Sequence, residues 1–166
     1  EVCLPLRSGQ DKGLTLVPVS VNVSARQFQQ PDFHKRVAEV LRKHSIDPSL
    51  IEIELTEGLV MEDIDSAQRE LAQLKKIGLR ISIDDFGTGY SCLSYLRRFP
   101  IDVLKIDKSF VQEIGGSRDG ESIIDAIISL AKSLRLETVA EGAEIHRRGG
   151  QSEAAGIEHA DLAVAH

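Results

Sequence analysis

The segment that decides the fold is Ile83-Asp84-Asp85-Phe86-Gly87-Thr88-Gly89-Tyr90-Ser91. It follows a β-branched run at 79–83, so two adjacent carboxylates stand where a strand is expected to end. Neighbouring carboxylates repel each other unless a cation or a proton lies between them. An isolated Asp-Asp pair is more simply explained as a strand end closed by turn-forming acids. The other strand ends therefore decide whether the pair belongs to a site.

The remaining sequence predicts a repeating strand–helix pattern. Apolar or alternating runs predict strands at 19–24, 51–55, 79–83, 103–106 and 137–140. Helical spacing predicts a helix that opens at Pro31-Asp32 and further helices at 63–76, 93–98 and 121–134, with Gly78 ending the second. Residues 1–18 show little pattern. Strands and helices that alternate at intervals near thirty residues predict a parallel sheet.

The strands alternate in polarity, which distinguishes between parallel architectures. Val19, Val21 and Val23 share one face of their strand, whereas the residues between them are small and polar. An open sheet covered on both faces would show continuous apolar runs. Alternation favours a (β/α)8 barrel, which needs about 250 residues. We therefore predict an α/β fold, an incomplete (β/α)8 TIM-type barrel of five to six βα units, with residues 1–166 as one partial domain.

Polar residues gather where the predicted strands end. They are Asn22, Glu54, Asp84, Asp85, Lys105, Asp107 and Glu141. Oxygen ligands of this kind select hard cations such as Mg²⁺ or Mn²⁺, and the five histidines lie away from these positions. Two such metals can clamp the attacking and leaving oxygens of a phosphodiester. Lys105 could orient the water or neutralise charge that develops on phosphorus.

Composition narrows the class of partner. The chain has 26 acidic against 20 basic residues and a net charge of -6, which argues against a general basic surface for nucleic acid. A phosphate ligand would then need an intervening metal. Two cysteines, Cys3 and Cys92, suggest no disulfide framework and suit the cytoplasm. No apolar run reaches membrane-spanning length. The first residue is Glu1, so we expect a piece of a longer protein.

Structural explanations remain open for each candidate. Asn22 could bond the strand edge, and Glu54 could form a structural ion pair with Lys105. Asp107 could cap a helix, and Glu141 could belong to a turn. The five phenylalanines, Phe110 among them, are expected in the core. The functional interpretation rests on the shared position of these residues at strand ends.

Five motifs together resemble the EAL-domain cyclic-di-GMP phosphodiesterases. They are Val21-Asn22-Val23-Ser24-Ala25-Arg26, Glu54-Leu55-Thr56-Glu57, Asp84-Asp85-Phe86-Gly87-Thr88-Gly89, Leu104-Lys105-Ile106-Asp107 and Ala140-Glu141-Gly142. The resemblance covers about residues 16–144. It implies a cytoplasmic barrel that hydrolyses cyclic diguanylate to linear pGpG with magnesium or manganese, as a homodimer in the intact protein.

The resemblance also implies a role for each residue. Asn22, Glu54, Asp84 and Asp85 would be metal ligands. Lys105 would lie by the catalytic water with Asp107 in support, and Glu141 would be a general base or a second metal contact. Glu57 would anchor the loop at 85–91, which in this family links the site to the dimer interface.

Two departures from the family pattern bear on activity. The first-strand Glu-Ala-Leu motif is absent, and residues 145–166 diverge from the family's ending. We therefore expect these 166 residues alone to be inactive. One alternative is a degenerate EAL module that acts as a cyclic-di-GMP receptor or a protein-interaction domain. A barrel lyase or aldolase that uses Lys105 is disfavoured, because a Schiff-base lysine needs an apolar pocket.

Overall fold

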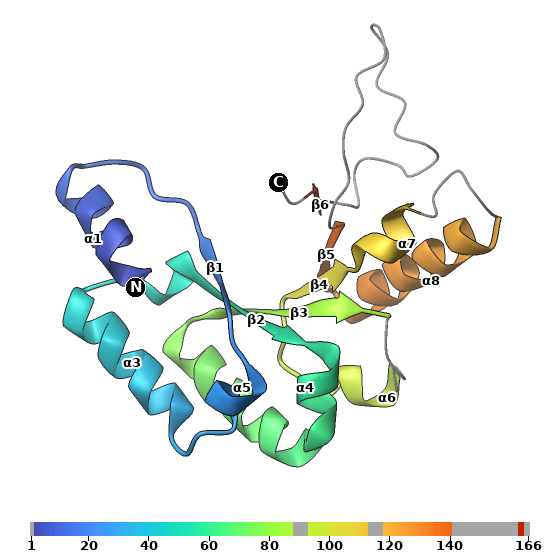
Figure 1. The fold of residues 1–166 in the computed structure, drawn as a ribbon, viewed down its shortest axis with the longest axis horizontal. Coiled ribbons are helices and arrows are strands. Elements are labelled where there is room, and N and C mark those ends of the chain that lie inside the picture. Colours follow the sequence, from blue (N-terminus) through green and yellow to red (C-terminus); the bar gives the residue numbers. More distant parts are fainter. Residues whose placement is uncertain (1, 88–92, 113–117, 141–162, 165–166) are drawn as a thin grey trace, which may run out of the picture. The chain divides into compact units, whose positions relative to one another are not determined.

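The computed structural model describes residues 2–87, 93–112, 118–140 and 163–164 (Figure 1). The chain forms two compact units, residues 1–82 with 92–101 and residues 83–91 with 102–166, and each is described by itself. The strands follow the sheet order β1-β2-β3-β4-β5-β6, which is also their order in the sequence. Strand β3 (Arg80–Phe86) begins in the first unit and ends in the second.

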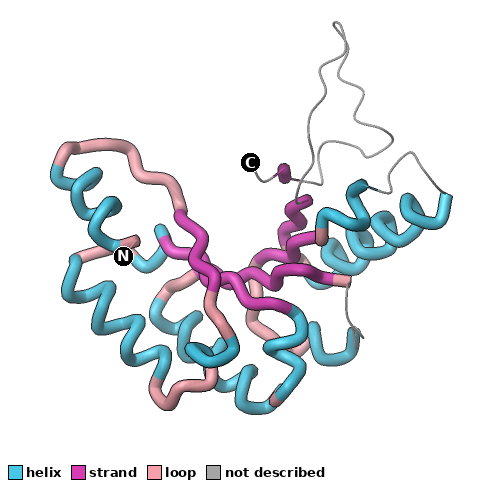
Figure 2. The backbone as a smooth tube through the Cα atoms, in the orientation of Figure 1, coloured by secondary structure: helices cyan, strands magenta, loops and turns pink. Residues whose placement is uncertain are grey.

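The first unit alternates strands with helices. It holds α1 (Cys3–Asp11), β1 (Val19–Asn22), α2 (Ala25–Phe28), α3 (Phe33–His44), the 3-10 helix η1 (Pro48–Leu50), β2 (Ile51–Thr56), α4 (Glu57–Glu62), α5 (Ile64–Ile77) and α6 (Leu93–Leu96). Strands β1 and β2, drawn with the other strands in magenta in Figure 2, are neighbours in the sheet. They pair in parallel, with Val19 opposite Ile51 and Asn22 opposite Glu54. Strand β2 lies beside the start of β3, where Arg80 Nε is 3.3 Å from Glu52 Oε2.

The residues of helix α5 explain where this helix begins, which side of it is buried and where it ends. Ala67, Leu71 and Leu74 recur at helical spacing and are all buried. Asp63 caps the helix by accepting a hydrogen bond from the Ser66 backbone N–H at 3.0 Å. Gly78 ends the helix at φ +102°, a left-handed conformation that glycine adopts without steric cost. The predicted C-cap is therefore confirmed.

A polar contact ties α3 to α5, which lie side by side (Figure 1). The backbone N–H of His34 donates to Glu70 Oε1 at 2.6 Å, and His34 Nδ1 lies 2.9 Å from Glu70 Oε2. One carboxylate thus satisfies a backbone donor at the start of α3 and also holds the imidazole ring.

The second unit repeats the same arrangement. It holds the end of β3, then β4 (Val103–Ile106), α7 (Lys108–Gln112), α8 (Arg118–Leu134), β5 (Glu137–Ala140) and β6 (Ala163–Val164). Strand β5 pairs in parallel with both β4 and β6. Helix α8 buries Ile124, Ile127, Ile128 and Ala131, a single apolar stripe at helical spacing.

The predicted strands and their parallel pairing are confirmed, but the first helix was missed. Residues 1–18 were expected to lack regular structure, and α1 lies within them. Pro5 and Gly9 hid this helix, because both residues are poor helix formers in a helix interior. Pro5 lies in the first turn, where its missing N–H would have no helical partner. No helix among the described residues is long and apolar enough to cross a bilayer.

The polar residues of the alternating strands differ in how exposed they are. Alternation in the sequence is real, but several polar members are buried: Glu54 is 5% exposed, Ser82 0% and Lys105 8%. Burial of a charged group requires partners, because its hydration is lost. The polar strand residues therefore depend on specific contacts.

The packing of α5 generates a stability prediction. Leu71→Ala removes a side chain that is 0% exposed, and we expect a loss of about 2–5 kcal/mol in the free energy of unfolding, as for similar buried leucines. Thermal melts of the full-length protein measure it. Val40→Ala, on the exposed side of α3, is the control and should leave the melting temperature nearly unchanged. Equal melting temperatures for the two variants would contradict this packing.

Candidate functional site

In the first unit, the ends of β1 and β2 place an amide beside a carboxylate. Asn22 and Glu54 are register partners, so their side chains leave the same face of the parallel pair. The Val23 N–H donates to the Glu54 carbonyl at 3.0 Å, which extends the pairing one residue past β1. Asn22 is exposed, whereas Glu54 is buried. The register thus places these two predicted metal ligands side by side, and their role stays a prediction.

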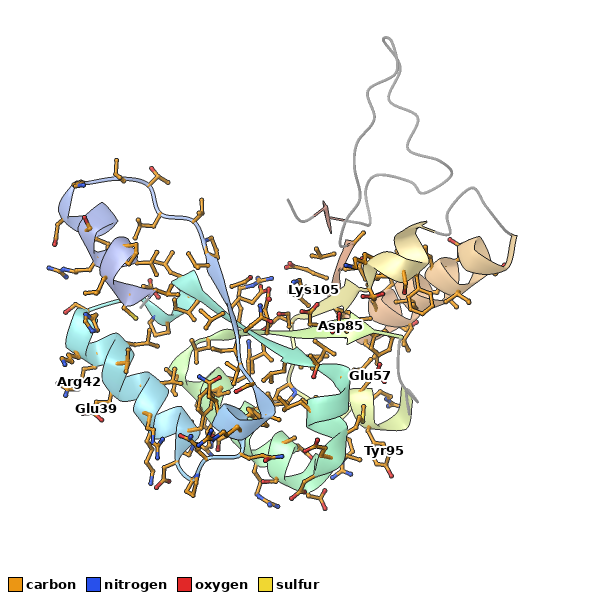
Figure 3. The ribbon with its side chains drawn as sticks, in the orientation of Figure 1. Glu39, Arg42, Glu57, Asp85, Tyr95 and Lys105 are labelled. Carbon is orange, nitrogen blue, oxygen red and sulfur yellow. The ribbon has the colours of Figure 1, made fainter. Side chains whose placement is uncertain are left out.

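In the second unit, the end of β3 brings a carboxylate to a lysine of β4. Lys105 Nζ lies 3.8 Å from Asp84 Oδ1, and the side chains are only 10% and 15% exposed. Asp84 Oδ1 also accepts a hydrogen bond from the Asp85 backbone N–H at 3.0 Å. A mostly buried carboxylate is stabilised by a cation and a backbone donor of this kind. Figure 3 labels Asp85 and Lys105 on their two strands.

Asp85, near the end of β3, connects this strand with the residue that precedes helix α7. Its φ of +54° lies in the left-handed region, which is uncommon for a residue other than glycine. Such strain is found most often at functional sites, where the surrounding structure maintains it. The side chain of Asp85 interacts with that of Asp107 and contributes to the lowered pKa of Asp107.

Asp107 caps α7, as the structural alternative proposed. Its Oδ1 accepts hydrogen bonds from the Ser109 backbone N–H at 2.8 Å and from the Ser109 hydroxyl at 2.5 Å. These two bonds are the main reason that the pKa of Asp107 lies below its usual value, with smaller contributions from Asp85 and Lys108. Capping and a supporting role beside Asp85 are compatible, because the carboxylate serves both contacts.

Two further predicted residues are Glu57 and Glu141. Glu57 is the first residue of α4 in the first unit, and it is buried (Figure 3). Its expected role as anchor for the loop at 85–91 stays a prediction, since only 85–87 of that loop is described. Glu141 lies outside the described residues, so its role also stays a prediction.

The described residues thus supply oxygen donors in pairs. Asn22 joins Glu54 in one unit, and Asp84 and Asp85 adjoin Lys105 and Asp107 in the other. Across the described ranges, no three His, Cys, Asp or Glu side chains gather into a group able to hold a metal. The donor chemistry nevertheless fits a hard divalent cation, which prefers carboxylate and amide oxygens.

Sequence reasoning missed two contributors to this site. Ser109 was not singled out, although a serine two residues after an aspartate is a recognisable turn signal. The close approach of Gly87 to Phe110 was also missed. No local signal reveals that contact, because it joins segments more than twenty residues apart.

Comparison with known proteins gives consistent matches. The family model described as EAL domain matches residues 1–157. The signaling protein YkoW of Bacillus subtilis is 45% identical over 144 residues, which are 87% of this chain and 18% of that protein. The cyclic di-GMP phosphodiesterase PdeR of Escherichia coli is 39% identical over 135 residues, 81% of this chain and 20% of that protein. The chain thus spans about a fifth of the length of these relatives.

Solved structures agree with these sequence matches. The PaMucR phosphodiesterase in complex with c-di-GMP is 42% identical with a TM-score of 0.80, and the match covers 86% of this chain and 57% of that one. Klebsiella pneumoniae BlrP1, in a manganese and c-di-GMP complex, is 29% identical with a TM-score of 0.74, covering 86% and 36%. The predicted barrel-type α/β class is confirmed by these neighbours. The chain belongs to the EAL domain family.

Proposed function

We propose that this chain forms part of a cyclic-di-GMP phosphodiesterase that hydrolyses cyclic diguanylate to linear pGpG. The observation that carries the proposal is the Lys105–Asp84 pair at the ends of β4 and β3 in an EAL domain. Relatives support it, since PdeR is named a cyclic di-GMP phosphodiesterase and PaMucR was solved with c-di-GMP. The substrate would be a cyclic dinucleotide, and the full-length protein would act as a cytoplasmic homodimer.

The cofactor in this proposal is Mg²⁺ or Mn²⁺. Asn22, Glu54, Asp84 and Asp85 would be the metal ligands, in a two-metal arrangement, as the family resemblance implies. The manganese in the BlrP1 complex supports this choice of ion. When bound, such ions polarise a phosphodiester and lower the pKa of a coordinated water.

The remaining residues would hold the metal ligands in position, compensate charge or take part in proton transfer. The Lys105 ammonium would neutralise charge that develops on the phosphoryl oxygens, and its contact with Asp84 sets where that charge lies. Asp107 would support Asp85, whose side chain lies beside it. Glu141 would act as general base or second metal contact, and Glu57 would anchor the loop after Asp85.

Metal dependence is the first test of this function. The full-length protein should lose hydrolysis of cyclic diguanylate in excess chelator and regain it with added Mg²⁺ or Mn²⁺, because the oxygen donors need the ion to meet an anionic substrate. Chromatography of the linear product measures turnover. Undiminished activity in chelator would contradict the two-metal proposal, whereas tight binding without product would favour the receptor alternative.

Lys105 provides the second test. Lys105→Met in the full-length protein keeps an unbranched side chain but removes the charge, and we expect kcat to fall on the order of a hundredfold with a smaller change in KM. Lys76→Ala, an exposed lysine at the end of α5, is the control and should leave kcat unchanged. A kcat for Lys105→Met within twofold of the unmodified protein would mean that Lys105 is only a structural partner of Asp84.

A further inference from the structure

We propose that Phe110 is a positioning residue, whose ring against Gly87 holds the end of β3 on α7 and so keeps Asp85 beside Asp107. The inference deepens the proposed function and rests on it for the catalytic meaning of Asp85. The contact itself stands on the geometry of the second unit.

The β3 side of this contact is a glycine that no other residue can replace without a shift. Gly87 has a φ of +100°, which side-chain-bearing residues rarely adopt. A Cβ added there would lie 2.9 Å from Phe110 Cε2 and 3.1 Å from Phe110 Cζ. Ile127 Cδ1 of α8 would be 3.6 Å away, an ordinary van der Waals distance. The absence of a side chain at Gly87 is therefore what lets the Phe110 ring approach.

The α7 side of the contact is held by its own cap. Ser109 bonds Asp107 through its backbone N–H and its hydroxyl, and the Phe110 N–H donates to the Asp107 carbonyl at 3.1 Å. The Asp107 carboxylate and the Phe110 ring thus belong to one hydrogen-bonded turn. A displacement of the ring would carry the carboxylate with it.

Two links therefore join the same two segments. Asp85 lies beside Asp107 and interacts with it, and two residues further along the chain Gly87 meets Phe110. Asp85 is left-handed at φ +54°, so its conformation depends on neighbours that hold it. Without the ring, the packing of Gly87 against α7 is lost, and the left-handed Asp85 two residues earlier is less constrained.

A purely structural role for Phe110 makes a different prediction. Phe99 is a buried phenylalanine of the first unit at 6% exposure, whereas Phe110 is only half-buried. If Phe110 served only to fill space, its shortening would lower stability and leave turnover unchanged. Phe99→Leu is therefore the matched control, since it makes the same substitution outside the proposed machinery.

The test compares Phe110→Leu with Phe99→Leu in the full-length protein. We expect Phe110→Leu to lower kcat on the order of tenfold and to raise the Mn²⁺ concentration for half-maximal activity, because the misplacement of a ligand by a fraction of an ångström is costly. Phe99→Leu should keep kcat within twofold at a comparable melting temperature. Equal kcat values for both variants would overturn the proposal.

A second test enlarges the residue at position 87 and shortens the one at position 110. Gly87→Ala brings a methyl group against the ring, so it should lower kcat more than Phe110→Leu does. The double variant Gly87→Ala/Phe110→Leu should be more active than Gly87→Ala alone, because the shorter side chain gives way. Strictly additive losses would show that the two residues do not act through their contact.

Hydrogen exchange separates this proposal from the function on which it rests. Amide exchange across 83–87, measured by mass spectrometry, should rise in Phe110→Leu and stay unchanged in Phe99→Leu. Amide exchange can be measured whether or not the protein has catalytic activity. Unchanged exchange in Phe110→Leu would overturn the positioning role even in an active enzyme. An unmodified protein without hydrolysis would overturn the proposed function alone.

Discussion

The compensation of the Asp84 carboxylate is the constraint on which the second unit depends. Two adjacent aspartates end β3, and the first is mostly buried. Its oxygen meets the Lys105 ammonium at 3.8 Å and the Asp85 N–H at 3.0 Å. Burial of an unpartnered carboxylate would cost several kcal/mol, so strand β3 could not end at this position without strand β4 beside it.

The same logic bears on how an acidic chain could meet the anionic cyclic dinucleotide proposed as its substrate. With 26 acidic against 20 basic residues, the protein lacks the general positive charge by which many proteins grip phosphates. Its strand ends instead carry carboxylate and amide oxygens, Asn22 beside Glu54 and Asp84 next to Asp85, where a hard cation would reverse the local charge.

Much of the fold could be predicted because the strands and long helices carry strong local signals. The spacing of Ala67, Leu71 and Leu74 and the stop at Gly78 are examples that the structure confirms. Helix α1 was missed, because Pro5 and Gly9 weaken helical propensity while tertiary packing buries Cys3 and Leu6. Strand ends indicated a common edge for Asn22, Glu54, Asp84 and Lys105, but not which of them would be neighbours, which the register and the Lys105–Asp84 contact specify. Sequence alone could not reveal Gly87 against Phe110, which is a contact of tertiary structure.

The register between β1 and β2 has a consequence for how this domain tolerates change. Asn22 stands opposite Glu54 because each strand contributes a fixed number of residues from Val19 and Ile51 onward. Successive side chains alternate between faces, so one inserted or deleted residue in either strand would turn Asn22 away from its partner. Strands β1 and β2 are therefore more sensitive to a change in their length than to a change of amino-acid type. Variation among natural sequences should appear there as substitutions, while insertions collect in the connections.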